Sequence, residues 1–229
     1  MKLLLTLFVI LFTSFSSTFA SDNNKFEGWS VEALTGSISS KAKLGQLLVD
    51  GASYSKSDFY LEDSSATSTP IKLNLIYSQP INSTFLIAYE FSSNAQKSSV
   101  DKTYGYSSGV KSDNSVINNI SSQFSLSILP GYIISENFLV FSKLGYASSK
   151  YSIDVNTSSL TNVKSPSLKG TVLGIGSKYN ISKNLYTSIS YEYTKYKSTN
   201  FTSTVSGYTL TQPIDVSTSA YLIGIGYKF

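Results

Sequence analysis

The sequence contains no cysteine, no histidine and no arginine among its 229 residues. Without cysteine it can form no disulfide, no thiolate zinc site and no thiol nucleophile. Without histidine it can form neither a Ser-His-Asp triad nor an imidazole metal site. All 18 basic residues are lysines, so bidentate guanidinium recognition of phosphate or guanine is excluded as well. We therefore expect no catalytic residues, no cofactor and no metal site.

Charge is also scarce, because charged residues make up 14% of the chain whereas soluble domains average about 25%. The formal net charge of +4 is too dilute over this length to indicate a partner made of nucleic acid. Hydrophobic residues supply 41% and aromatic residues 14%. The length fits one all-β domain.

The first 20 residues have the pattern of a secretory signal peptide. Lys2 gives a short positive region, Leu3 to Phe12 form an apolar run, and Thr18 and Ala20 are small residues at the −3 and −1 positions of a cleavage site. The run is shorter than the about 20 residues of a spanning helix, and an uncleaved N-terminal anchor is the alternative. We expect a signal peptide at 1–20 and one exported domain at 21–229.

Alternation with a period of two residues dominates the rest of the chain and predicts β-strands. Segments of this kind lie at 29–33, 71–78, 85–91, 123–132, 139–146, 173–179, 185–193 and 221–229. In most segments one face is rich in Tyr, Phe, Ile and Leu, while the other carries Ser, Gly, Lys or Glu. The apolar face of 29–33 holds Trp29, Val31 and Ala33, and 139–146 is a weaker case because Leu139 and Phe141 have the opposite parity. The pattern predicts eight antiparallel strands.

The connections between these strands alternate in length. Short turns are expected at 79–83, 133–137 and 180–184, and long polar loops at 36–69, 92–119, 147–170 and 194–219. Short periplasmic turns and long extracellular loops are typical of outer-membrane barrels. The expected fold is an all-β, eight-stranded, antiparallel, up-and-down transmembrane barrel.

The position of the charges favours a barrel in lipid. A lysine on the lipid face near mid-depth would cost about 2–4 kcal/mol, and the apolar faces carry no charge. The charged strand residues share the opposite parity, which predicts that they face the lumen. A soluble barrel or sandwich would place the apolar face inside. The aromatic-rich apolar faces and the export signal favour the membrane barrel.

The final strand ends in the motif GIGYKF, with Ile225, Tyr227 and Phe229 at alternate positions. This ending resembles the assembly signal that the outer-membrane insertion machinery recognises. Together with LPGY…NFLVFSKLGY and NLYTSISYEY, it is similar to the small eight-stranded outer-membrane β-barrel superfamily, which includes opacity-type surface proteins and OmpA-like transmembrane barrels. The resemblance implies a location in the bacterial outer membrane, with outer-membrane lipid and the insertion machinery as partners.

The inward charges are expected to plug the lumen, because an eight-stranded barrel is just wide enough for side chains to fill it. If the first short turn is centred near Ile81, Lys72 and Glu90 face one another across the hairpin. The alternative is that the charges line a conducting path. The predicted lumen network consists of Glu32, Lys72, Glu90, Lys143, Lys178 and Glu192.

The long loops are the expected location of function. Their aromatic residues are candidate contacts for host, phage or glycan ligands, although they could instead continue the strands or form the aromatic girdle. These candidates are Tyr54, Phe59, Tyr60, Tyr104, Tyr106, Tyr151, Tyr196, Phe201 and Tyr208. The apolar segment 44–49 could extend a strand or cover the barrel mouth.

Three functions are compatible with this pattern. The first is a surface protein, structural or adhesive, that contacts ligands through its loops. The second is a narrow, porin-like channel for ions or small solutes. The third is an enzyme acting on membrane lipid, which the lack of histidine disfavours because histidine commonly supplies the general base. We expect the first function and no enzymatic activity.

Overall fold

The computed structural model describes residues 25–50, 52–53, 59–95, 98–107, 110–155, 161–164, 166–205 and 208–229. The expected signal peptide at 1–20 and the candidate contact residue Tyr54 lie outside these ranges. No helix in the described part of the chain is long and apolar enough to cross a membrane.

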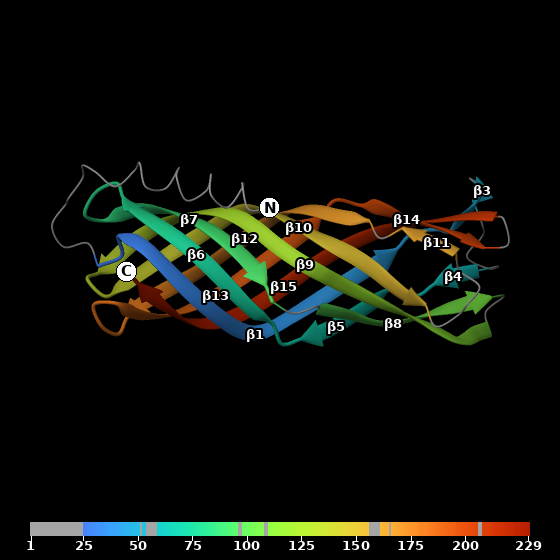
Figure 1. Ribbon diagram of the computed structural model, residues 1–229, viewed down its shortest axis with the longest axis horizontal. Helices are drawn as coiled ribbons and strands as arrows, with labels where there is room; N and C mark the ends of the chain where they lie inside the picture. The colour runs from blue at the N-terminus through green and yellow to red at the C-terminus, as the bar shows by residue number, and fades with distance from the viewer. Residues whose placement is uncertain are drawn as a thin grey trace, which may run out of the picture.

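The described residues form one antiparallel sheet of fifteen strands, and eight of these strands close into a ring (Figure 1). The ring strands are β1 (Gly28–Leu44), β6 (Ile71–Pro80), β7 (Phe85–Asn94), β9 (Val110–Ser135), β10 (Phe138–Val155), β12 (Ser167–Asn180), β13 (Leu185–Tyr196) and β15 (Tyr208–Lys228). The ring closes where β15 pairs with β1. The predicted eight-stranded barrel is therefore confirmed, and its closure leaves no open sheet edge in the membrane.

The closing seam between β1 and β15 runs from Ser30↔Lys228 to Leu44↔Ile214. Gly36 lies within this seam with a φ of 156°, and a Cβ atom at this position would overlap the carbonyl oxygen of Tyr221. Only glycine permits so close an approach of the two backbones.

Three short turns lie at the end of the barrel that also holds the C-terminus, at residues 81–84, 136–137 and 181–184 (Figure 1). In the first turn the Asn82 side chain accepts the backbone N–H groups of Thr84 and Phe85, each at 2.8 Å. Asparagine favours turns for this reason. We call this end of the barrel periplasmic, following the plan of outer-membrane barrels.

The outer wall of the barrel is apolar, as the alternation predicts. Leu73, Leu126, Ile175, Ile189 and Ile225 are between 53% and 65% exposed, although each lies within a strand. Aromatic residues border this band. Near the periplasmic turns, the rings of Phe85 and Tyr132 lie 5.1 Å apart and those of Tyr227 and Phe229 lie 5.5 Å apart. Exposed Phe124, Tyr146, Tyr193 and Tyr221 mark the other border.

Beyond this second border the structure corrects the prediction of four long polar loops. β1, β9, β10 and β15 continue well past the membrane band. Seven shorter strands join them, namely β2 (Leu48–Val49), β3 (Ala52–Ser53), β4 (Phe59–Leu61), β5 (Ser64–Ser68), β8 (Ser98–Ser107), β11 (Thr161–Lys164) and β14 (Thr199–Val205). We call this part of the sheet the extracellular extension. In the segment 44–49, Leu44 is the last residue of β1 and Leu48–Val49 form the separate strand β2, which pairs with β15.

The alternation of residue types does not predict the extension, because the apolar residues change from the outer face to the inner face where the barrel leaves the lipid. On β13, Tyr193 faces outward and Glu192 inward, but farther along Lys195 faces outward and Tyr196 is buried. The side of the sheet on which each residue lies does not change. Only the surroundings outside the barrel change, from hydrocarbon to water, and an apolar row then belongs on the inside.

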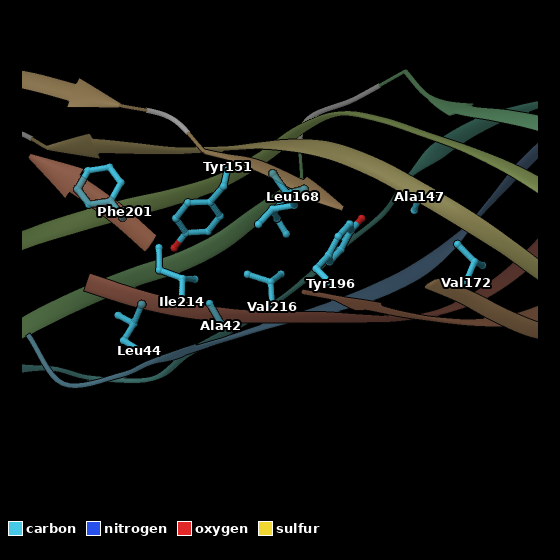
Figure 2. Packing of buried hydrophobic residues seen from close by; sticks show 11 residues of the cluster. Ala42, Leu44, Ala147, Tyr151, Leu168, Val172, Tyr196, Phe201, Ile214 and Val216 are labelled. Carbon is cyan, nitrogen blue, oxygen red and sulfur yellow. The ribbon is translucent and has the colours of Figure 1, made fainter. Parts of the chain in front are cut away.

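The interior is filled in three layers. Buried apolar residues including Phe26, Ile76 and Leu139 form the periplasmic layer. Charged side chains occupy the middle, beside a small cluster of Leu34, Ile38, Ala220 and Leu222. A larger apolar cluster, the upper cluster, fills the extracellular extension (Figure 2). Its members are Ala42, Leu44, Ile120, Ala147, Tyr151, Leu168, Val172, Tyr196, Phe201, Ile214 and Val216.

Candidate functional site

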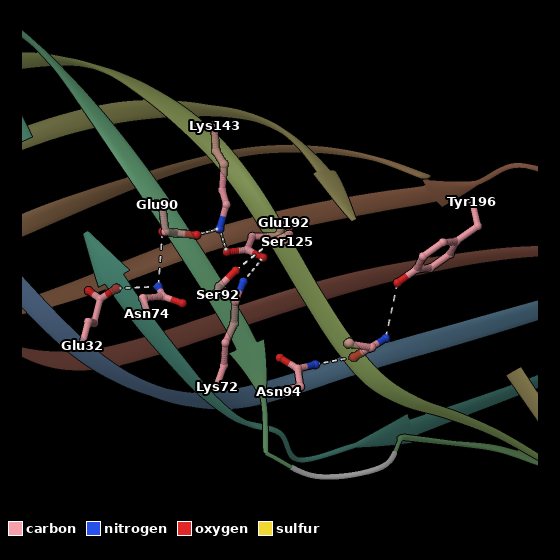
Figure 3. A network of polar contacts seen from close by, with 11 residues as sticks. Glu32, Lys72, Asn74, Glu90, Ser92, Asn94, Ser125, Lys143, Glu192 and Tyr196 are labelled. Atoms are coloured by element: carbon pink, nitrogen blue, oxygen red, sulfur yellow. Dashed lines mark hydrogen bonds and ion pairs between the residues drawn. The ribbon is translucent and has the colours of Figure 1, made fainter. Parts of the chain in front are cut away.

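A network of buried ion pairs crosses the middle of the lumen (Figure 3). The Glu192 carboxylate lies 2.5 Å from the Lys72 ammonium and 2.6 Å from the Lys143 ammonium. Lys143 also lies 2.5 Å from a carboxylate oxygen of Glu90. The structure thus brings together the four residues at the centre of the predicted network, and all four are at most 9% exposed.

Asn74 extends the network to Glu32. Its side-chain amide donates to Glu32 at 2.8 Å and to Glu90 at 3.2 Å. Two carboxylates facing each other repel unless a donor lies between them, and the amide group supplies two N–H bonds. The sequence reading did not select Asn74 for this role. The sequence feature that indicates this role is the position of Asn74 two residues after Lys72, which places both side chains on the same inward face of the strand.

These contacts connect strands that are not neighbours in the sheet. Lys72 is on β6 and Glu192 is on β13, and β1 and β15 separate the two strands around the ring. Glu90 on β7 and Lys143 on β10 are separated by β9. The contacts therefore pass through the lumen rather than along the wall, and the pair of Lys72 and Glu192 reaches farthest across it. In so narrow a barrel such cross-links fill the cross-section with side chains.

One detail of the predicted network is wrong. Lys72 does not face Glu90 across the β6–β7 hairpin, because Lys72 pairs with Asn94 and Glu90 pairs with Ile76. The turn lies at 81–84, where Asn82 caps it, and is not centred on Ile81. This displacement preserves parity, so both side chains still face inward, and Lys72 reaches Glu192 across the lumen instead.

Lys178 lies on the periplasmic side of this network. Its ammonium group lies 4.8 Å from the centre of the Tyr186 ring and 5.9 Å from that of the Phe141 ring. Both distances are within cation–π range. Lys178 also interacts electrostatically with Glu32 and Glu90. The three buried lysines are therefore balanced by three buried glutamates.

Tyr186 needs space at this level of the lumen, and Gly226 on the adjacent strand β15 provides it. A Cβ atom at Gly226 would overlap the Tyr186 ring. The Tyr186 hydroxyl donates to Ser30 at 3.3 Å.

Uncharged polar groups continue the network toward the extension. The hydroxyls of Ser92 and Ser125 are 2.6 Å apart, Asn94 donates to Gln123, and Gln123 donates to the Tyr196 hydroxyl at 3.5 Å (Figure 3). A cavity of about 50 Å³ lies beside these groups and Lys72. This volume is close to that of one or two water molecules. Side chains therefore occupy most of the lumen at this level.

Three of the aromatic residues selected as ligand contacts are buried in the upper cluster, which corrects the expectation that they are exposed. Tyr151 is 0% exposed, Tyr196 is 3% and Phe201 is 7% (Figure 2). They lie on strands of the extension and face its interior, where burial raises the pKa of the Tyr151 phenol above its ordinary value. They pack the extension and cannot meet a ligand from outside.

The Tyr151 hydroxyl has no hydrogen-bond partner among the described residues. We expect Tyr151→Phe to leave the free energy of unfolding unchanged or to raise it by about 1 kcal/mol, because no bond is lost and an unsatisfied polar group is removed. Tyr196→Phe is the matched control and should lose about 0.5–1.5 kcal/mol with its bond from Gln123. Urea unfolding of the refolded protein in lipid vesicles measures both. A larger loss for Tyr151→Phe than for Tyr196→Phe would contradict the assignment.

The other selected residues are placed as follows. Tyr208 is 58% exposed at the start of β15. Tyr104 and Tyr106 are partly buried on β8, and the Lys111 ammonium lies 3.6 Å from the centre of the Tyr104 ring. The backbones of Phe59 and Tyr60 are in β4. Ile225, Tyr227 and Phe229, the proposed assembly signal, all lie on the outer wall and are 49–71% exposed.

No group of three or more Asp or Glu side chains among the described residues is arranged to hold a metal ion.

Solved structures of other outer-membrane proteins share this architecture, and two of them are compared with this chain. The outer membrane protein OprG from Pseudomonas aeruginosa is 15% identical, with a TM-score of 0.63 over 89% of this chain and 96% of OprG. The outer membrane protein AlkL, determined in DMPC lipid bilayers, is 16% identical, with a TM-score of 0.51 over 94% of this chain and 95% of AlkL. At these identities the likeness shows a common fold.

No curated protein sequence matches the chain. A family model does match it, over residues 7–229, and its description is outer membrane protein beta-barrel domain. The match covers nearly the whole chain and agrees with the closed ring, the apolar wall and the polar lumen. The chain belongs to this family of β-barrel proteins of the bacterial outer membrane.

Proposed function

We propose that this protein is a surface protein of the outer membrane that contacts ligands through its extracellular extension and keeps its lumen closed. The observation that carries the proposal is the buried network of Lys72, Glu90, Lys143 and Glu192 across the lumen. Apolar layers fill the barrel on both sides of it. These features support a plug and leave the outer surface of the extension as the place for contacts.

The candidate contact surface lies at the tip of the extension. It includes Val110, which is 71% exposed, Tyr208 and the stacked pair of Lys111 and Tyr104. Exposed tyrosines among small polar residues suit contacts with proteins or glycans, because the ring offers a large area at a low entropic cost. Host, phage and glycan ligands are the proposed partner classes. Assembly by the insertion machinery through Ile225, Tyr227 and Phe229 is part of the same proposal.

A planar-bilayer experiment distinguishes this function from a narrow channel. We expect the refolded protein, Lys143→Ala and Glu90→Ala to show negligible conductance, because the apolar layers remain when one charge is removed. A heat-modifiable gel shift confirms that each sample is folded. Stable conductance steps in the unchanged protein, with an ion selectivity that either substitution alters, would support the channel and overturn the plug.

Binding is tested separately. Beads carrying the refolded protein are applied to a glycan array and to cultured epithelial cells, and compared with beads carrying Tyr208→Ser and Tyr104→Ser together. Retention that falls several-fold in the variant would support the tip as the contact surface. Equal retention of both proteins would overturn that assignment.

A further inference from the structure

Six exposed lysines, which we call the lysine row, lie on the outside of the barrel just beyond the apolar band. They are Lys41 and Lys43 on β1, Lys150 on β10, Lys169 on β12, Lys195 on β13, and Lys197, which directly follows the end of β13. Neither the ion network in the lumen nor the contact surface at the tip uses them. Their position is therefore a separate feature of the molecule.

On β10 and β13 the lysines lie beyond the aromatic residues that mark the border of the membrane. On β13, Tyr193 is the last outward aromatic residue and Lys195 is the next outward position. Lys197 is also exposed and lies just after the strand ends. On β10, one outward position, Ser148, lies between the outward residues Tyr146 and Lys150. Aromatic belts lie at the level of the lipid head groups. Lysine side chains bury their methylene stems and extend their ammonium groups to this level.

The row covers one side of the barrel continuously. Its strands, β10, β12, β13 and β1, are consecutive around the ring except for β15, which lies between β13 and β1. The register connects them, because Lys195 pairs with Ser217 on β15 and Ser217 pairs with Lys41. On the other side, the outward residues near this level are Ser93 on β7 and Ser65 and Thr67 on β5. At this level the described outward side chains of β5 and β7 are therefore uncharged, whereas those from β10 to β1 include the lysine row.

The row carries an excess of positive charge. Lys195 forms an ion pair with Asp215, and both side chains are substantially exposed. The remaining five lysines form no ion pair with any described residue. Asp63 lies close to β1, but its carboxylate accepts the backbone N–H of Leu44. Adjacent strands are about 4.8 Å apart, well within a Debye length, so neighbouring ammonium groups repel one another unless anions lie between them.

We propose that the lysine row binds the phosphate groups of lipids in the leaflet that surrounds the extracellular side of the barrel. Phosphate-bearing head groups are the anions available at this depth, and their negative charge complements the row. Binding would follow the arc from β10 to β1 and would orient this side of the barrel toward anionic lipid. The proposal does not depend on the ligand contacts at the tip.

The test compares lipid selectivity in reconstituted vesicles. The protein and the double variant Lys169→Gln and Lys197→Gln are placed in phosphatidylcholine vesicles, and the association of spin-labelled phosphatidic acid is measured against that of spin-labelled phosphatidylcholine. Lys169 and Lys197 are neighbours, because the backbone N–H of Lys197 donates to the carbonyl of Lys169 at 2.8 Å. The matched control is Lys25→Gln and Lys183→Gln, which removes the same charge at the periplasmic end.

We expect the unchanged protein to prefer phosphatidic acid by about threefold or more at low salt, and the preference to decline in high salt. The double variant should lose at least half of this preference, and the control should retain it. Equal preference in all three proteins, or an equal loss in the control, would overturn the proposal.

A soluble polyanion is the competing occupant. Heparin is added to the protein in pure phosphatidylcholine vesicles. Heparin binding that depends on Lys169 and Lys197, without any preference for phosphatidic acid, would overturn the lipid assignment. A preference for phosphatidic acid that heparin does not reduce would support it.

Discussion

Replacing Glu192 by glutamine is expected to lower the free energy of unfolding by about 3–5 kcal/mol, the usual cost of removing one partner from a buried ion pair. Glu192 is the shared carboxylate of Lys72 and Lys143, at 2.5 and 2.6 Å. Lys143 retains Glu90 in this variant. Lys72 has no other ion-pair partner among the described residues, so its ammonium group would remain buried without a counter-charge.

The exposed pair of Lys195 and Asp215 provides the control for this experiment. Asp215→Asn removes a carboxylate from an ion pair in the solvated extension, where such pairs contribute about 0–1 kcal/mol. Urea unfolding in lipid vesicles, followed by circular dichroism, measures both variants. If Glu192→Gln costs no more than Asp215→Asn, water solvates the network and it does not plug the lumen.

A double variant separates the loss of the pair from the loss of one charge. Glu192→Gln combined with Lys72→Met removes both charges and leaves no unpaired ammonium group. Removing a buried pair together often costs far less than breaking it. We expect the double variant to recover most of the stability lost by Glu192→Gln. Equal losses in the single and double variants would mean that shape, rather than charge, determines the effect.

Parity along the strands was sufficient to predict most of the lumen. A strand places successive side chains on opposite faces, so Glu32, Lys72, Glu90, Lys143, Lys178 and Glu192 had to share one side once the apolar face was assigned to lipid. Register was harder to predict, because it depends on the local geometry of each turn. The hydrogen bonds of Asn82 moved the first turn and changed the partner of Lys72 without changing its face.

The extracellular extension could not be predicted from a single rule for the apolar face. Residues such as Ile214, Val216 and Leu168 lie inside it, whereas within the membrane apolar residues lie mainly outside. On β9 a further irregularity appears near Ser122, which has a φ of 51°, where the pairing with β10 shifts its register. This bulge turns Ile120 inward. The level at which the two faces invert produces no periodic pattern of residue types in the sequence. The bulge produces none either, so neither feature could be predicted.

The inversion also explains why the sequence alone does not predict the lysine row. Lys41, Lys150 and Lys169 were part of segments interpreted as polar loops, in which charged residues need no explanation. Once these segments are strands, Lys150 and Lys169 occupy outward positions on the adjacent strands β10 and β12, and Lys41 faces outward on β1, farther around the ring. The lysines then form a feature of the barrel surface, which the composition of the separate segments does not show.

Introducing a lysine on the lipid face is the second change with a large expected effect. Ile175 on β12 is 65% exposed and lies between Tyr179, at the periplasmic border, and Lys169, beyond the other border. We expect Ile175→Lys to lower the free energy of unfolding by about 2–4 kcal/mol, because an ammonium group near the midplane must leave water for hydrocarbon. Urea unfolding in vesicles of short-chain phosphatidylcholine measures this loss.

The control for this change lies on the same strand. Thr171 also faces outward but is closer to the head groups, so Thr171→Lys should cost about 0–1 kcal/mol. The chain itself already tolerates a lysine on β12 at the opposite parity, because Lys178 is buried in the lumen beside Tyr186. The cost of a lysine on this strand is therefore set by which face it occupies and at what depth. Equal stability of Ile175→Lys and Thr171→Lys in lipid would mean that the wall at Ile175 does not meet hydrocarbon, and the assignment of the two faces would be wrong.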